Sequence, residues 1–177
     1  MNNKTRLIFL LIFSIFTVSC MKSQLEVTYN KQEEQIDKYI SQKDTLAIVR
    51  NSGANRIIIK QGEGEGLAKD GYVSFYYAGY AFNGSVSASN LFTTNRIATA
   101  QEANWNIEDI DVELYEISLK DAELIPGLKY GLKGVKPGEE CEILFSAKYG
   151  FGNKALGIIP AKTALLYKIW VVGVTND

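Results

Sequence analysis

The chain has 177 residues, of which 46% are hydrophobic and 22% charged, as in an ordinary globular protein of one domain with short additions. Its net charge of -1 excludes the basic face that a nucleic-acid partner would need. The sequence has no histidine, which excludes Ser-His-Asp and Cys-His catalysis and removes the commonest zinc ligand. The two cysteines lie far apart, so we expect no disulfide framework, no metal and no cofactor.

Residues 1–19 have the pattern of a signal peptide. Two basic residues, Lys4 and Arg6, precede an apolar run over residues 7–18 that is too short to span a bilayer. The run ends in Thr17-Val18-Ser19-Cys20, which resembles the lipobox of bacterial lipoproteins. The resemblance implies cleavage before Cys20 and lipidation of its thiol and new N-terminus. The alternative is an ordinary secretory signal that happens to end at a cysteine.

Lipidation would anchor the protein, because each buried CH₂ contributes roughly 0.8 kcal/mol and several acyl chains together bind stably. We therefore expect a membrane partner, reached through the lipid anchor, and a place in the bacterial cell envelope. The residues Met21-Lys22-Ser23 lack the acidic tract that would direct export to the cell surface. By resemblance, this favours the outer membrane with the domain facing the periplasm.

Residues 20–54 are predicted to form a tether followed by a helix. Met21–Asn30 is polar, and the next segment, Gln32–Ile48, carries spaced apolar residues among many charges. This spacing is typical of an amphipathic helix, here ending near Gln42. Two roles stay open for the helix: a spacer or cap that packs on the domain, and a contact in a dimer.

The compact domain is predicted over residues 55–177. Alternating and β-branched patterns predict strands over Arg56–Lys60 and residues 71–82, 112–119, 140–145 and 163–174. We interpret Gly62-Glu-Gly-Glu-Gly66 as a turn and not as a phosphate loop, since no Gly-Lys-Ser/Thr follows. Leu91-Phe92 is expected inside a polar loop, and residues 97–109 form another loop.

The stretch from Glu123 to Glu139 predicts one short helix and a tight turn. Pro126 suits a first helical position, Gly134 suits a helix stop, and Pro137-Gly138 suits a type II turn. A helix this short is unstable alone in water, so it must lie on the neighbouring sheet. The domain is therefore expected to be α+β, mostly antiparallel sheet with one short helix across it. Cys141, in a strand, is expected to be buried and unreactive.

Five motifs follow one another in a recognisable order. They are Tyr77-Ala-Gly79, Glu-Leu-Ile-Pro-Gly-Leu at 123–128, Gly-x-x-x-Gly-Glu at 134–139, Tyr-Gly-Phe-Gly at 149–152 and Gly-Ile-Ile-Pro at 157–160. This order and spacing resemble the FKBP-type peptidyl-prolyl cis-trans isomerases, and in particular Bacteroidetes lipoprotein members with a helical lead segment. The resemblance implies a bent antiparallel sheet of five to six strands wrapped on one short helix.

The resemblance also implies a pocket between helix and sheet that binds proline-containing segments of unfolded or folding proteins. It assigns catalytic positions to Tyr77, Ile125, Phe151 and Tyr167, with the Ile125 N–H directed at a substrate carbonyl. It assigns substrate contacts to Phe92, Tyr115, Leu124, Leu128, Ile158 and Ile159. Aromatic and aliphatic residues on strands are more often simply core, and Phe75 is interpreted in that way.

Four positions depart from the family pattern. Leu128 stands where the family has tryptophan, Thr93 where it has an acidic residue, Phe151 where it has tyrosine, and Tyr167 where it has phenylalanine. The flap between Gly152 and Gly157 is also about one residue short. Loss of one neutral hydrogen bond from the flap costs about 0.5–1.5 kcal/mol, which weakens catalysis without abolishing it.

These departures leave three functions open. The first is an isomerase of weakened or altered activity that assists the folding of envelope proteins. The second is an FKBP-like module that binds a peptide or a protein without turnover. The third is a structural lipoprotein with no pocket function. For all three, we expect weak binding of the macrolide inhibitors that stack on the family tryptophan.

Overall fold

The fold is described from a computed structural model over residues 24–176, so the predicted signal peptide and Cys20 lie outside the described residues. An N-terminal helix over residues 24–41 precedes the sheet. The strands are β1 (Ala47–Asn51), β2 (Ala54–Lys60), β3 (Tyr72–Phe82), β4 (Leu91–Thr94), β5 (Tyr115–Ser118), β6 (Glu140–Phe145) and β7 (Ala164–Thr175). The helices are α2 (Ile97–Glu102) and α3 (Pro126–Leu132), with 3-10 turns η1 (Ala88–Asn90), η2 (Ile107–Asp109) and η3 (Ala147–Tyr149).

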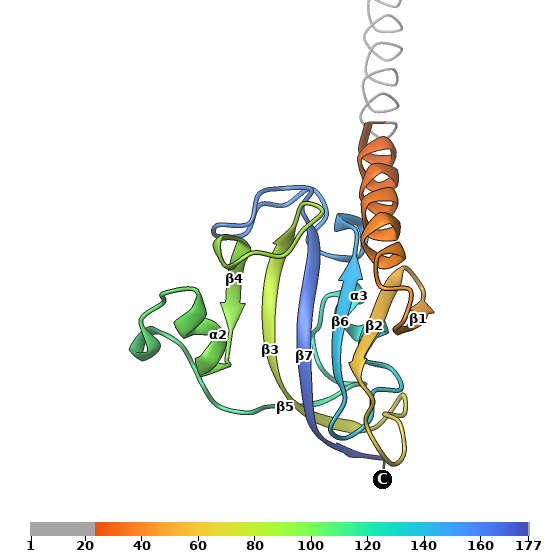
Figure 1. Ribbon diagram of the computed structural model, residues 1–177, viewed down its shortest axis with the longest axis vertical. Coiled ribbons are helices and arrows are strands. Elements are labelled where there is room, and N and C mark those ends of the chain that lie inside the picture. Colours follow the sequence, from red (N-terminus) through yellow and green to blue (C-terminus); the bar gives the residue numbers. More distant parts are fainter. Residues whose placement is uncertain (1–23, 177) are drawn as a thin grey trace, which may run out of the picture.

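The strands form one seven-stranded sheet in the order β1-β2-β6-β7-β3-β4, with β5 also paired to β3. Every pairing is antiparallel, and the long strands β3 and β7 form the centre of the curved sheet (Figure 1). The predicted α+β fold with a bent antiparallel sheet and one short crossing helix is confirmed. The sheet has one strand more than the upper expectation, because β1 adds an edge strand beside β2.

Helix α3 lies on the inner face of the sheet, at the residues expected for it. Pro126 begins the helix, and Leu128 and Leu132 are buried in the main core. A Cβ atom on Gly127 or Gly131 would collide with Phe145 or Ile143, so these glycines let the helix backbone approach β6 closely. The short helix is thus stabilised by the sheet beneath it, as its length requires.

The end of α3 is held by a buried ion pair. The Arg56 guanidinium donates to the carbonyl oxygens of Gly131, Lys133 and Gly134 at 3.0, 2.7 and 3.4 Å. Its Nε atom lies 3.3 Å from a carboxylate oxygen of Glu139, an ion-pair contact without a hydrogen bond. Both side chains are almost fully buried, so a charged group of β2 satisfies the free carbonyls at the helix end.

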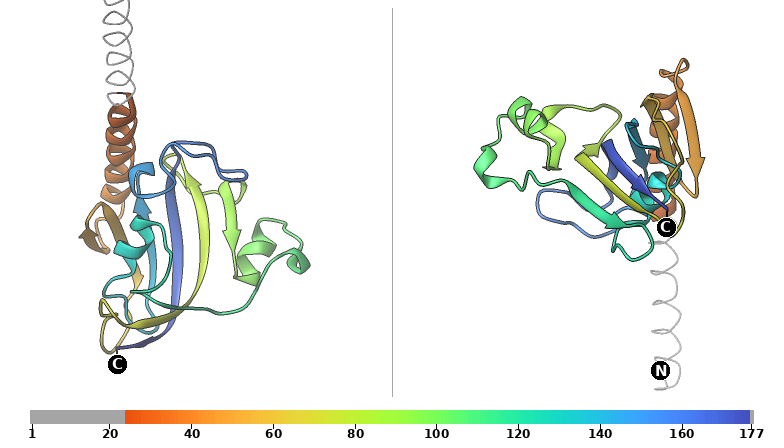
Figure 2. Two further views of the ribbon diagram at one scale, coloured as in Figure 1. Left: turned by 180° about the vertical axis from the view of Figure 1, so that it is seen from behind. Right: turned by 90° about the horizontal axis from the view of Figure 1, so that it is seen from below.

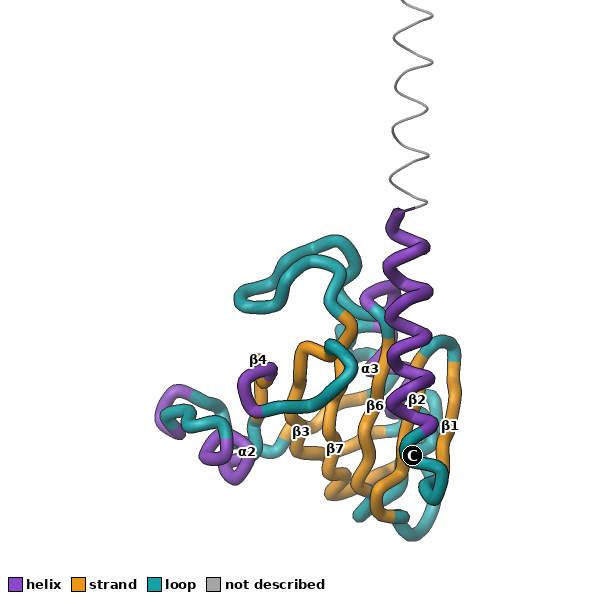
Figure 3. The backbone as a smooth tube through the Cα atoms, turned by 45° about the horizontal axis from the view of Figure 1, so that its top comes forward, coloured by secondary structure: helices purple, strands orange, loops and turns teal. Residues whose placement is uncertain are grey.

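The N-terminal helix packs on the opposite, outer face of the sheet. Ile36 and Ile40 are buried in a second core, together with Ile57, Leu144 and Leu166. Figure 3 shows the helix lying over the β2 and β6 side of the sheet. Both faces of the central strands are therefore covered at this end of the molecule, which explains why β7 has apolar residues on both faces.

One prediction for this region is wrong: residues 24–30 are helical and not a polar tether. The helix ends at residue 41, close to the expected end near Gln42. Residues 47–51 form β1, a strand that was not predicted. Leu46 and Ile48 are two residues apart, which places them on one face of a strand but on nearly opposite faces of a helix, and residues 47–51 pair with β2. The sheet therefore begins before residue 55.

The region between β4 and β5 also differs from the expectation. Leu91 and Phe92 belong to β4, which pairs with β3, and residues 97–102 form α2 and not a loop. Figure 2 shows α2 and the loop after it projecting from the β4 edge, away from the N-terminal helix. The strand has only four residues, which is too few for a periodic pattern to stand out in the sequence.

Cys141 lies in the main core, as expected for this strand position. Burial, with a smaller contribution from nearby Glu139, raises the pKa of its thiol well above the ordinary value. Within residues 24–176, no helix combines the length and the apolar character that crossing a bilayer requires.

Candidate functional site

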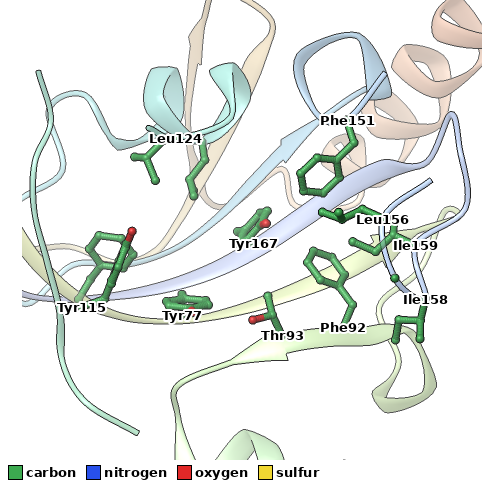
Figure 4. Close-up of a pocket in the computed structure, with 13 residues that line it drawn as sticks. Tyr77, Phe92, Thr93, Tyr115, Leu124, Phe151, Leu156, Ile158, Ile159 and Tyr167 are labelled. Carbon is green, nitrogen blue, oxygen red and sulfur yellow. The ribbon is translucent and has the colours of Figure 1, made fainter. Parts of the chain in front are cut away.

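The inner face of the sheet borders a cavity of about 660 Å³. Its walls come from the sheet, from the segment that enters α3, and from the loop over residues 147–163 between β6 and β7, which we call the flap (Figure 4). The lining residues are Phe75, Tyr77, Phe92, Thr93, Tyr115, Leu124, Leu128, Phe151, Leu156, Gly157, Ile158, Ile159 and Tyr167. A cavity of this size, lined mainly by apolar side chains, suits a short segment of peptide or a small organic ligand.

Aromatic rings form two of the cavity walls. On one side, Tyr115 meets Phe75 and Tyr77 edge-on, with ring centroids 5.5 and 5.8 Å apart. On the other side, Tyr167 meets Phe92 edge-on at 5.8 Å and stacks on Phe145 at 6.1 Å. These arrangements are the favourable ones for aromatic pairs, so the rings hold one another in place without a ligand.

Two buried polar side chains fix the backbone at Tyr77. The Asn95 side chain accepts a hydrogen bond from the Tyr77 N–H at 2.7 Å, and its amide donates to the Glu113 carbonyl at 2.8 Å. The Thr94 hydroxyl donates to the Tyr77 carbonyl at 2.7 Å. Asn95 therefore joins β3 to the segment that leads into Tyr115, and so fixes the distance between two cavity walls.

No lining residue carries a formal charge, and the polar groups in the cavity are hydroxyls. Those of Tyr77, Thr93, Tyr115 and Tyr167 make no hydrogen bond to any other described residue. The Tyr167 hydroxyl lies near the middle of the lining residues in Figure 4. Burial, and to a lesser extent nearby Tyr77, raises the pKa of Tyr167 above its ordinary value of 10.0, so the phenol stays protonated at neutral pH.

Nine of the ten site residues expected from the sequence line this cavity. Ile125 is the exception: it precedes α3 as its N-cap, and its carbonyl accepts the Lys129 N–H at 3.1 Å. Its own N–H donates no hydrogen bond to another described residue. The catalytic and binding roles of all ten residues stay predictions.

Three lining residues were not expected in the site, and Thr93 was noted only as a departure from the family pattern. Phe75 is fully buried, as its core interpretation requires, but its ring also borders the cavity. Its position two residues before Tyr77, on the same strand face, was the available signal. Leu156 and Gly157 belong to the flap, where no periodic pattern indicates which residues point inward.

An uncharged cavity walled by aromatic rings is a site for binding an apolar segment, and it has no acid or base suited to proton transfer. Comparison with known proteins identifies the class. The profile of the family described as FKBP-type peptidyl-prolyl cis-trans isomerase matches residues 64–172. The chain belongs to this family.

Individual relatives agree with that assignment. The chain is 25% identical over 126 residues to the FKBP-type peptidyl-prolyl cis-trans isomerase FkpA of Buchnera aphidicola, with 71% of this chain covered. It spans only 44% of that relative's length. It is 24% identical over 117 residues to FK506-binding protein 1 of Aspergillus oryzae, covering 66% of this chain and 94% of that protein.

A solved structure shares the fold. The crystal structure of FkpA from Escherichia coli superposes with a TM-score of 0.57 at 16% sequence identity. The match covers 99% of this chain and 74% of the FkpA chain.

Proposed function

We propose that this protein is a peptidyl-prolyl cis-trans isomerase of weakened or altered activity, and that the cavity described above binds the proline and the residue before it. The observation that carries the proposal is the uncharged, aromatic-walled cavity on the inner face of the sheet. The substrates would be proline-containing segments of unfolded or folding proteins.

Isomerisation needs a site of this kind. Rotation about the X–Pro bond has a barrier of roughly 18–20 kcal/mol, because the amide loses resonance when it twists. The twisted amide is less charge-separated than the planar amide, so an apolar, water-poor cavity stabilises it relative to bulk water. A site that binds the twisted state more tightly than the planar state accelerates the rotation. No nucleophile, general base or metal is required.

Each lining residue would have a role that follows from its position in the cavity. Tyr77, Phe92 and Tyr167 would surround the proline ring, with Leu128 beneath it. The Ile125 N–H, which donates to no other described residue, would hold a substrate carbonyl beside the rotating bond. This arrangement positions the peptide while leaving the X–Pro bond free to turn.

A second candidate function is peptide or protein binding without useful turnover. The residues that favour it are Leu128, Thr93 and Phe151, each a departure from the family pattern in the cavity lining. A smaller residue at the floor and one hydroxyl fewer on the flap both reduce the contacts that distinguish the twisted peptide from the planar one. Binding would then persist while catalysis weakened.

The experiment that separates the two functions is exchange NMR on a short X–Pro peptide with the full chain in mild detergent. Wild type, Tyr77→Ala and Tyr72→Ala would be compared, since Tyr72 is exposed on the same strand and lies outside the cavity. Faster exchange that is lost in Tyr77→Ala and kept in Tyr72→Ala supports the isomerase. Peptide shifts without faster exchange support the binding module, and no response at high protein concentration contradicts both.

The cellular setting belongs to the same proposal. Residues 17–20 resemble a lipobox, and this supports lipid anchoring through Cys20 on the periplasmic side of the outer membrane, where the clients would be envelope proteins. A Cys20→Ser variant should lose its membrane association after the signal segment is removed. Continued fractionation of that variant with membranes would show that lipid on Cys20 does not hold the protein there.

A further inference from the structure

The side chain of Gln32 joins the N-terminal helix to the flap by hydrogen bonds. Its amide nitrogen donates to the Lys162 carbonyl at 2.6 Å, and its amide oxygen accepts the Ala147 N–H at 2.9 Å. Ala147 is the first residue of the flap and Lys162 is next to its last. A single side chain from outside the flap thus closes the flap at its base, by bonding to both of its ends.

The surroundings of Gln32 favour these two hydrogen bonds. Its side chain is buried, with a residue exposure of 9%, so the two bonds are largely shielded from bulk water. The next two turns of the same helix place Ile36 and Ile40 in the outer core, which fixes the helix on the sheet. One turn earlier, the Tyr29 hydroxyl lies beside Gly152 of the flap. The helix therefore holds the flap through Gln32, with Tyr29 close by.

The base of the flap, which Gln32 closes, is connected to residues that line the cavity. Lys162 N–H donates to the Gly152 carbonyl at 2.8 Å, next to Phe151. Farther along, Leu156 and Ile159 exchange two backbone hydrogen bonds of 2.9 Å, so the two arms of the flap are joined at two places. Phe151 and Ile159 both line the cavity. An opening at the base would therefore release the cavity wall that these residues form.

We propose that Gln32 is a positioning residue for the pocket, and that the N-terminal helix acts through it to hold the flap in its binding conformation. Gln32 lies outside the cavity lining and so does not touch the substrate. Without its bonds, only a fraction of molecules has the flap in place. The apparent peptide affinity is reduced by that fraction, while a molecule with the flap in place works at the normal rate.

The test compares Gln32→Met with Gln35→Met in the full chain. Methionine keeps the length and apolar volume of glutamine but makes neither bond, and Gln35 is an exposed glutamine on the same helix. The first measurement is hydrogen–deuterium exchange by mass spectrometry, resolved into the flap peptides and the remaining peptides. Loss of two neutral hydrogen bonds predicts about tenfold faster exchange in residues 147–163 of Gln32→Met alone.

The second measurement is the peptide titration, which rests on the proposed function. Gln32→Met should raise KM, or the Kd for a non-turned-over peptide, about five- to tenfold, with kcat changed less than about twofold. Unchanged flap exchange in Gln32→Met would overturn the proposal, and so would an equal increase throughout the domain, since Gln32 would then be a general folding contact. If the wild type catalyses no exchange, the proposed function fails, and the flap measurement still decides the role of Gln32.

Discussion

The rings of Tyr77 on β3 and Tyr115 on β5 meet edge-on, with centroids 5.8 Å apart and planes inclined by 69°. Both rings line the cavity, and both also contact Phe75 beneath them. The cavity wall is thus made of side chains that position one another, so removing one ring should disturb the contribution of the other.

Tyr115→Ala should weaken peptide binding about tenfold, since it removes one ring and frees the other. The double variant with Tyr77→Ala should lose less affinity than the two single losses added together, by about 0.5–1.5 kcal/mol. The measurement is a double-mutant cycle on peptide affinity. Strict additivity would show that the two rings bind independently.

Catalysed exchange should be constant between about pH 5 and pH 9, apart from any titration of the peptide itself. The lining residues include no carboxylate, amine or imidazole, and burial keeps the pKa of Tyr167 above its ordinary value of 10.0. The check is exchange NMR across this range with a peptide that has no titrating side chain. A step near the pKa of a carboxyl group would mean that an acidic residue outside the cavity takes part.

Stability should fall as the pH rises above about 9, where the Cys141 thiol of the unfolded chain ionises, and further above about 10, where its tyrosines ionise. Burial raises the pKa of Tyr167 in the folded state, with Tyr39 and Tyr80 shifted in the same direction. The folded protein then keeps protons that the unfolded chain releases. The stability from these groups is complete below the unfolded pKa and is lost progressively above it.

The variant that tests this linkage is Tyr167→Phe. The free energy of unfolding should fall between pH 7 and about pH 11 in both proteins. The fall in Tyr167→Phe should be about 1 kcal/mol smaller than the fall in wild type. Tyr72→Phe, at an exposed tyrosine, is the matched control and should behave as wild type. Urea unfolding at both pH values gives the comparison, and parallel losses in all three proteins would contradict the assignment to Tyr167.

Arg56→Met should lower the free energy of unfolding by about 3–5 kcal/mol, because it leaves the Glu139 carboxylate buried without its partner. The chain offers a control in Lys60, which lies 3.7 Å from Glu140 with the two side chains 66% and 40% exposed. Lys60→Met should cost less than about 1 kcal/mol. Thermal and urea unfolding measure both variants, and similar losses would show that burial does not decide the cost.

Leu128 lies at the cavity floor, where the FKBP family has a tryptophan. We expect wild type to bind the macrolide inhibitors of the family weakly, and Leu128→Trp to bind them at least about tenfold more tightly, through a larger aromatic surface. Isothermal titration calorimetry provides the affinities. If Leu128→Trp is folded by circular dichroism but binds the inhibitors no more tightly, Leu128 is not the cause of the weak binding. The flap residue Phe151 would then be the next to test.

Local patterns in the sequence were sufficient to predict most of the sheet and the short helix. Pro126 begins α3 and Gly134 follows its end with a φ of +75°, because these residue types act through their own backbone geometry. The strands β3 and β7 were located to within about one residue by their long alternating or apolar runs. Together with the ordered motifs, these elements were enough to identify the family and nine of the residues around its cavity.

Contacts between segments that are distant in the sequence could be identified only in the folded structure. The Gln32 bonds join residues 130 and 115 positions apart, and Asn95 joins Tyr77 to Glu113 across two strands. The edge strand β1 exists because β2 offers it free backbone groups, and its five residues are too few for a clear strand pattern in the sequence. The sequence by itself therefore determined most of the elements and the chemistry of the pocket, since these depend on local residue types. The tertiary structure decided which side chains hold the pocket walls in place, because that depends on which distant segments meet.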